Sequence, residues 1–284
     1  MRWTKLLAAG AYLLVLYLAV TGIVTFRLYQ RAEPPMVEVS PSSTEAFRVT
    51  SLDGQDIGGW YSAGEAAKPV VLVLHGMGGN RSTETDVVRH LQARGLGVCA
   101  ISFRAHGDSS GDRLDLPGTR LDTLAAMDWL QKRCPGRTVE VFGSSLGAGA
   151  ALMAGGELGQ RVHAYLLESP YHDLDTAVWN RVHHELPWGF DRLAYAGLRL
   201  WAPVWVPGGL AAVHPGVDAT AIPSNIPIVL MAGSADTRAT LAEIQAIYRS
   251  VASHARLVVF PGADHGGLGG TDPKLYWGTF DETL

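Results

Sequence analysis

The segment Gly-Ser-Ser-Leu-Gly at residues 143–147 limits the possible folds of this chain more than any other feature. An apolar run at 138–142 precedes it and predicts a buried strand, and a run of small residues at 148–154 follows it and predicts a helix packed closely on a sheet. A chain that turns this sharply from strand to helix strains the central residue, and the flanking glycines relieve the crowding. Ser145, rather than Ser144, is therefore predicted to be an exposed nucleophile at a helix N-terminus, where backbone N–H groups favour negative charge.

A β-hairpin is expected first, with strands at 47–51 and 57–61 on either side of a turn at Asp53-Gly54. Short apolar segments then alternate with helical segments along the rest of the chain. Strands are expected at 70–74, 98–102, 139–142, 164–168, 228–232 and 257–260, and helices near 83–94, 119–133, 146–158 and 240–251. Nearly continuous apolar strands separated by helices predict an α/β fold with a mostly parallel sheet covered on both faces.

The span 170–224 between the sixth and seventh of these strands, counting the hairpin as two strands, is too long for an ordinary connection. It predicts a helical cap inserted after the sixth strand of the sheet. The cap holds four of the chain's eight tryptophans, which are Trp179, Trp188, Trp201 and Trp205. They are expected to form a small core of the cap, an apolar wall over the active site, or a surface that contacts a bilayer.

A serine nucleophile needs a base that takes its proton and an acid that orients the base. Asp236 follows the strand at 228–232, and His265 follows the last strand. Because parallel strands end at the same edge of a sheet, these loops are expected to meet beside Ser145. Glu168 and Asp264 are the competing acids, the first at a strand end and the second beside the histidine.

An oxyanion hole needs two backbone N–H donors near the attacked carbonyl group. The N–H of Leu146, which follows the nucleophile, is one candidate. The other is the N–H of Met77, which has a glycine on each side directly after the strand at 70–74.

These motifs together resemble the α/β-hydrolase superfamily of serine hydrolases from about residue 47 to the C-terminus. The segment 75–78 (His-Gly-Met-Gly) is similar to the family's oxyanion segment, and 103–111 is similar to its Arg-Gly-His-Gly-x-Ser-x-Gly loop, with Ala105 in place of a glycine. The resemblance is strongest to esterase, lipase and serine-aminopeptidase-like members with an N-terminal anchor. It implies structural roles for Arg104 and His106, and serine at the elbow argues against the dehalogenase and epoxide-hydrolase branches.

The motifs and the resemblance together predict cleavage of a carboxylic ester, in a small molecule or a lipid, through Ser145, His265 and Asp236. No cofactor and no metal is expected; the pair His183-His184 lacks a partner spacing for a metal and is expected at the surface. A serine peptidase or thioesterase on the same triad is an alternative, and so is a non-catalytic hydrolase-like binding or scaffold protein. Net charge −4 without a basic cluster argues against nucleic acid as a partner.

The N-terminal part contains an uncharged apolar segment at 6–26, long enough to cross a hydrocarbon core of about 30 Å. Residues 1–31 are expected to be a single-pass membrane anchor, with a signal peptide or a buried core helix as alternatives. The N-terminus is expected in the cytoplasm and the catalytic domain, 47–284, outside it, although balanced flanking charges determine the orientation poorly. The linker at 32–46 is rich in proline and serine and is expected to hold the domain a short distance from the bilayer.

Two cysteines, Cys99 and Cys134, complete the candidate residues. Inert buried thiols are the simpler interpretation, and a disulfide between them is the alternative if the domain lies outside the cytoplasm.

Overall fold

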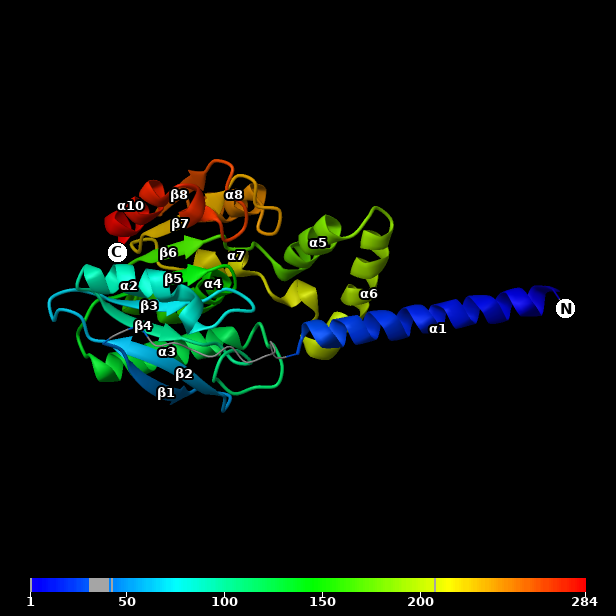
Figure 1. The fold of residues 1–284 in the computed structure, drawn as a ribbon, viewed down its shortest axis with the longest axis horizontal. Helices are drawn as coiled ribbons and strands as arrows, with labels where there is room; N and C mark the ends of the chain where they lie inside the picture. Colours follow the sequence, from blue (N-terminus) through cyan, green and yellow to red (C-terminus); the bar gives the residue numbers. More distant parts are fainter. Residues whose placement is uncertain (1, 31–40, 42, 207) are drawn as a thin grey trace.

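The computed structural model describes residues 2–30, 41, 43–206 and 208–284 and contains one eight-stranded sheet (Figure 1). The order of the strands across the sheet is β1-β2-β4-β3-β5-β6-β7-β8. The strands are β1 (Glu45–Thr50), β2 (Asp56–Ser62), β3 (Val70–Leu74), β4 (Gly97–Ile101), β5 (Val139–Ser144), β6 (Tyr165–Glu168), β7 (Ile228–Gly233) and β8 (Ala255–Phe260). Strand β1 begins two residues before the predicted start of the catalytic domain at residue 47.

Only the first strands of the sheet run antiparallel. Strand β1 pairs with β2, and β2 pairs with β4, both antiparallel, as expected for the hairpin. All later pairs are parallel, and Leu72 of β3 lies opposite Cys99 of β4 and Val141 of β5. Every residue of β3, β4 and β7 is buried, because helices cover both faces of the sheet.

The helices divide between the two faces of the sheet. One face packs against α3 (Thr119–Arg133), α4 (Leu146–Leu158) and α8 (Leu241–Ser250). The other face packs against α2 (Thr85–Ala93), which the short 3-10 helix η1 (Arg81–Glu84) precedes, and against α9 (Leu268–Thr271) and α10 (Pro273–Thr283). The sequence prediction matched α3 and α4 at both ends and did not include α9 or α10.

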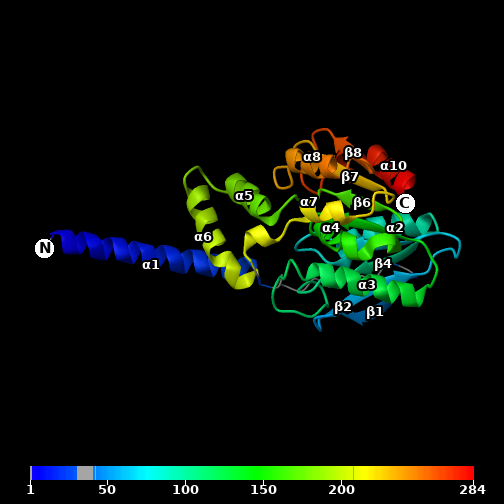
Figure 2. The ribbon, with the colours of Figure 1, turned by 180° about the vertical axis from the view of Figure 1, so that it is seen from behind.

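The cap lies between β6 and β7, where the long span predicted it. Its longer helices are α5 (Leu174–Glu185) and α6 (Phe190–Trp205), and the short helices η3 (Leu210–Ala212), α7 (Pro215–Asp218) and η4 (Ala219–Ala221) lead back to the sheet. Another short helix, η2 (Gly159–Arg161), follows α4. The α5–α6 hairpin stands away from the sheet on the side towards the N-terminal helix (Figure 2).

Helix α1 (Arg2–Leu28) extends far beyond the rest of the molecule (Figure 1). Its segment Trp3–Leu28 is long and apolar enough to cross a membrane and is largely exposed along its length. The C-terminal half of α1 packs directly against α6, and Tyr29 accepts a backbone hydrogen bond from Leu114. Most of the linker expected at 32–46 lies outside the described residues.

Candidate active site

Three loops at the carboxyl edge of the sheet bring together the side chains of Ser145, Asp236 and His265. Ser145 follows β5, Asp236 follows β7 and His265 follows β8. The Oγ of Ser145 lies 2.9 Å from Nε2 of His265, and Nδ1 of His265 lies 2.8 Å from Oδ2 of Asp236. The parallel topology thus joins residues separated by up to 120 positions into one hydrogen-bonded chain.

The backbone at Ser145 is strained. Its φ of 49° and ψ of −104° are sparsely populated for a residue with a side chain. A Cβ at Gly143 would lie 2.7 Å from Ala148 N, and one at Gly147 would overlap the carbonyl oxygen of Leu74. Both glycines are therefore required by the tight passage from β5 into α4, as the motif predicted.

The environment of Asp236 favours one tautomer of the imidazole of His265. Its side chain is fully buried, and its Oδ1 accepts hydrogen bonds from the backbone N–H groups of Arg238 and Ala239. Burial raises the pKa of Asp236, but the hydrogen bond and charge of His265 and the two N–H donors outweigh it, so the pKa lies below its usual value. An ionised Asp236 accepts the Nδ1 proton of His265, which leaves Nε2 free to accept a proton from Ser145.

The two competing acids do not contact the imidazole in this structure. The Oε2 of Glu168 accepts a hydrogen bond of 2.8 Å from the hydroxyl of Tyr276 on α10, and burial raises the pKa of Glu168. Asp264 is exposed, and its carbonyl oxygen accepts the N–H of Gly267 in the local turn.

The candidate oxyanion donors lie on two adjacent segments. Leu146 is the first residue of α4, so its N–H has no acceptor within the helix. A Cβ at Gly76 would lie 3.7 Å from the Cβ of Ser145, which places the segment that contains Met77 directly beside the elbow. The N–H of Ser145 itself donates to Glu168 O, so it is used in the sheet.

Two histidines support the segment that contains Met77. His75 is buried; its Nδ1 donates to Gly76 O at 2.7 Å, and its Nε2 accepts the N–H of Phe103 at 3.0 Å. Burial and the nearby His106 lower the pKa of His75 to about 3, so the ring stays neutral and keeps both bonds. His106 in turn accepts the N–H of Gly78 at 3.4 Å.

Arg104 ties the 103–111 loop to three carboxylates. Its guanidinium is almost completely buried and forms ion pairs with Asp53, Asp115 and Asp122. These pairs hold the loop against α3 and the β1–β2 turn. The contacts of Arg104 are structural in kind, as the resemblance implied.

Sequence reasoning did not find Glu84, which ends η1. Burial and the charge of Glu168 raise the pKa of Glu84 to about 8, and the nearby backbone of Gly76 offsets part of this rise. Glu84 therefore lies near the backbone of Gly76, next to the segment that contains Met77. A glutamate in an otherwise ordinary helix start carried no signal of this contact, because only the fold brings it under Gly76.

The remaining candidates lie away from the three side chains. His183 is exposed and pairs with Asp191, and His184 is exposed as well, as predicted for a surface pair. Cys99 and Cys134 are both free thiols, so the disulfide alternative does not hold in this structure.

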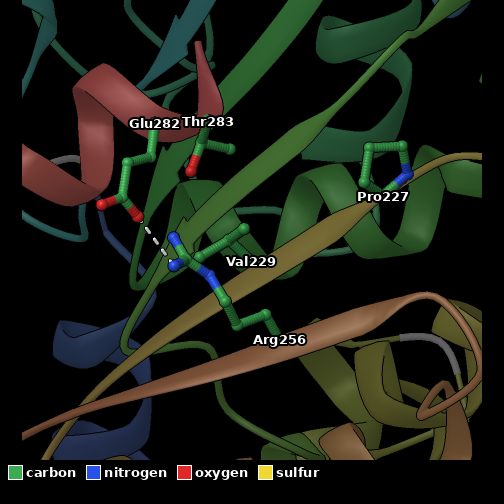
Figure 3. Close-up of a pocket in the computed structure, with 5 residues that line it drawn as sticks. All are labelled: Pro227, Val229, Arg256, Glu282 and Thr283. Atoms are coloured by element: carbon green, nitrogen blue, oxygen red, sulfur yellow. Dashed lines mark hydrogen bonds and ion pairs between the residues drawn. The ribbon is translucent and has the colours of Figure 1, made fainter.

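A shallow cavity of about 190 Å³ lies at the opposite edge of the sheet (Figure 3). Pro227 and Val229 line it at the amino end of β7, and Arg256 of β8 crosses it to pair with Glu282 of α10. Because Ser145 and His265 follow the carboxyl ends of their strands, this cavity is separate from them.

Comparison with known proteins identifies the family. Residues 65–206, half of the chain, match the family described as serine aminopeptidase, S33. The chain belongs to this family of hydrolases. The hydrolase is also 30% identical to the uncharacterized protein MT2364 of Mycobacterium tuberculosis, over 92% of this chain and 88% of that protein. It is 32% identical to the lysophosphatidylserine lipase ABHD12 of Bos taurus, over 39% of this chain and 29% of the relative.

Solved structures confirm the fold of the hydrolase. The esterase Pf2001 of Pyrococcus furiosus superimposes with a TM-score of 0.73 at 23% identity, over 89% of this chain and 97% of the esterase. An esterase of Exiguobacterium antarcticum gives a TM-score of 0.62 at 16% identity, over 83% of this chain and 98% of that chain. The α/β-hydrolase fold predicted from the motifs is thereby confirmed.

Proposed function

We propose that this hydrolase cleaves carboxylic esters with Ser145 as nucleophile, His265 as general base and Asp236 as the acid that orients the base. The observation that carries the proposal is the chain of two hydrogen bonds, 2.9 Å and 2.8 Å long, that ends on the strained Ser145. Nucleophile, base and acid in this arrangement are the geometry that acyl transfer requires.

The reaction proceeds in two acyl transfers. Nε2 of His265 takes the hydroxyl proton of Ser145 while Oγ attacks the ester carbonyl carbon, and Asp236 stabilises the resulting imidazolium. The imidazolium gives its proton to the leaving alcohol, which departs and leaves an acyl-serine. Water, deprotonated by His265, then attacks the acyl-serine, and the returned proton restores Ser145 and releases the acid.

The oxyanion is assigned to the N–H groups of Met77 and Leu146. Leu146 lies at the N-terminus of the 13-residue helix α4, where the helix dipole favours negative charge. The glycines on both sides of Met77 allow its backbone to face the substrate. Two preorganised donors of this kind contribute about 10²–10³ each to kcat in enzymes that use them.

The proposed substrate is an ester with an apolar acyl or alkyl group, presented at a membrane. The names of the relatives, a lysophosphatidylserine lipase and an esterase, agree with an ester bond in a lipid or a small molecule. In this proposal residues 1–31 form the single-pass anchor, 32–46 the linker and 47–284 the catalytic domain outside the cytoplasm, with the cap at about 170–224. The apolar, exposed Trp3–Leu28 supports the anchor.

A peptidase is the second candidate, favoured by the description of the matched family as serine aminopeptidase. Both reactions pass through the same tetrahedral intermediate, so the site alone does not separate them. The test is a panel of p-nitrophenyl esters from acetate to laurate and a panel of aminoacyl p-nitroanilides, with full-length protein in vesicles. Ester hydrolysis that rises with chain length and stops in Ser145→Ala supports the proposal, whereas turnover of the anilides alone would favour the peptidase.

A further inference from the structure

Helix α1 and cap helix α6 contact each other along about half the length of α1. The hydroxyl of Tyr17 donates to Leu193 O at 2.9 Å, and Nε1 of Trp201 donates to Oγ1 of Thr21 at 3.2 Å. Further along, the rings of Phe26 on α1 and Trp205 on α6 lie 5.4 Å apart. The contacts advance along both helices in the same order, and α6 crosses α1 steeply in both views (Figures 1 and 2).

The contact is close because small residues face it. A Cβ at Gly197 would overlap the side chain of Thr21, and a Cβ at Gly22 would lie 3.2 Å from the ring of Trp201. Small residues that let two helices approach are typical of helix pairs in membranes. The position of α6 relative to α1 is therefore fixed by packing.

The position of α6 along α1 sets its depth. From Tyr17 to Phe26 the helix rises about 14 Å, roughly half of a hydrocarbon core of about 30 Å. Figure 1 shows the sheet beyond the C-terminal end of α1, and only the α5–α6 hairpin level with its last turns. If α1 spans a bilayer, this hairpin lies at the depth of one leaflet and the sheet lies outside.

The exposed surface of the hairpin is apolar where it would meet lipid. Its exposed apolar side chains are Leu186, Trp188, Phe190, Leu193, Leu200 and Val204. At 3.6 residues per turn, the α6 members of this set lie beside the row of Gly197, Trp201 and Trp205 that faces α1. The charges of Arg192 and Arg199 lie on the opposite side of the helix. An amphipathic helix of this kind lies at a membrane interface with its apolar side in the acyl chains.

We propose that α6 and the α5–α6 loop are embedded in the leaflet that holds the C-terminal half of α1, and that their exposed apolar row contacts acyl chains. The cap then enters the layer in which a lipid ester resides, and the domain is held on the bilayer by two helices instead of one. This proposal rests on the membrane anchor of the proposed function. It is independent of the reaction at Ser145.

The test measures the depth of single bimane labels on full-length protein in phosphatidylcholine vesicles, with Cys134 replaced by serine and the buried Cys99 left in place. Labels are attached to Leu200→Cys on α6, to Leu13→Cys on α1, and to Leu52→Cys on the exposed β1–β2 turn as the matched control. Each label is quenched in turn by spin-labelled acyl chains and by aqueous iodide, a cooperative urea unfolding curve checks that each variant is folded, and fluorophosphonate labelling is measured separately.

We expect acyl-chain quenching of the labels at 13 and 200, and iodide quenching of the label at 52. If lipid quenches the label at 13 but only iodide quenches the label at 200, the proposal of an embedded cap is wrong. The membrane anchor is then still supported. If neither is quenched by lipid, the anchor itself fails and the embedded cap with it, while fluorophosphonate labelling reports separately on the enzyme.

Discussion

Asp236 and Glu168 are both buried carboxyl groups near His265, and the reaction needs only one of them. We predict that Asp236→Asn lowers kcat on a soluble ester by about 10⁴, because an amide no longer holds the imidazole in the required tautomer. Glu168→Gln, the matched control, retains activity to within about tenfold, because Glu168 bonds to Tyr276 instead of the imidazole. Steady-state kinetics decide between them, and a larger loss in Glu168→Gln than in Asp236→Asn would assign the acid to Glu168.

The pKa of Glu84 predicts how stability changes with pH. Its pKa is about 8 in the folded protein against an ordinary value of 4.5, so folding favours the protonated form. This stabilisation is fully present below pH 4.5 and is lost as the pH rises through 8. Asp236 and His75, whose pKa values are lowered, act in the opposite direction, Asp236 only at acid pH and His75 up to about pH 6.5.

We therefore predict that the urea midpoint of the wild type falls between pH 6.5 and 8, and that Glu84→Gln makes this fall smaller. The measurement is a series of urea unfolding curves at both ends of the range. Equal slopes for the two proteins would show that Glu84 is solvated in the folded protein.

The positions of Ser145, Asp236 and His265 could be predicted because each follows a recognisable strand in a parallel sheet. Parallel strands end at the same edge of a sheet, so the three loops meet there. Glu84 and Tyr276 could not, since their nearness to Glu168 depends on how α10 and η1 pack on the sheet. Sequence patterns report on the strand that carries a residue more reliably than on the neighbours that surround it.

At the scale of elements, the passage from β5 into α4 depends on Gly147. We predict that Gly147→Ala destabilises the protein by about 1–3 kcal/mol, because the added Cβ would overlap Leu74 O and push α4 away from β3. Gly278→Ala, in the middle of α10 with no atom within 4 Å of the added Cβ, should instead stabilise it by about 0.5–1 kcal/mol. Urea unfolding of both variants makes the comparison; a neutral Gly147→Ala would contradict the tight elbow.

Elements with strong periodicity were the ones that sequence could place. The bounds of strand β3 (Val70–Leu74) were predicted correctly because the segment is continuously apolar. The bounds of helix α3 (Thr119–Arg133) were predicted correctly because clear breaks flank it. Helix α10 was missed although Asp272-Pro273 is a typical helix start. The contact between α1 and α6 was beyond prediction, because nothing local relates Gly197 to Thr21.

At the scale of the whole molecule, the contact between α1 and α6 sets how the domain sits on its anchor. We predict that Gly197→Leu, which forces the two helices apart at Thr21, lowers hydrolysis of long-chain esters in vesicles while hydrolysis of a soluble acetate ester is retained. Gly10→Leu is the matched control, because a Cβ added there has no atom within 4 Å. Rates on both esters for both variants test this; equal long-chain rates would mean that the helix contact does not affect access to lipid.

The central claim, that Ser145 is the nucleophile of a serine hydrolase, is tested most directly by covalent labelling. Full-length wild type, Ser145→Ala and Ser144→Ala are treated with a fluorophosphonate probe, and the labelled peptide is identified by mass spectrometry. The structure predicts that wild type and Ser144→Ala are labelled on Ser145, the residue hydrogen-bonded to His265, and that Ser145→Ala is not labelled. Labelling that persists in Ser145→Ala, or wild-type protein that does not react while folded, would contradict the account.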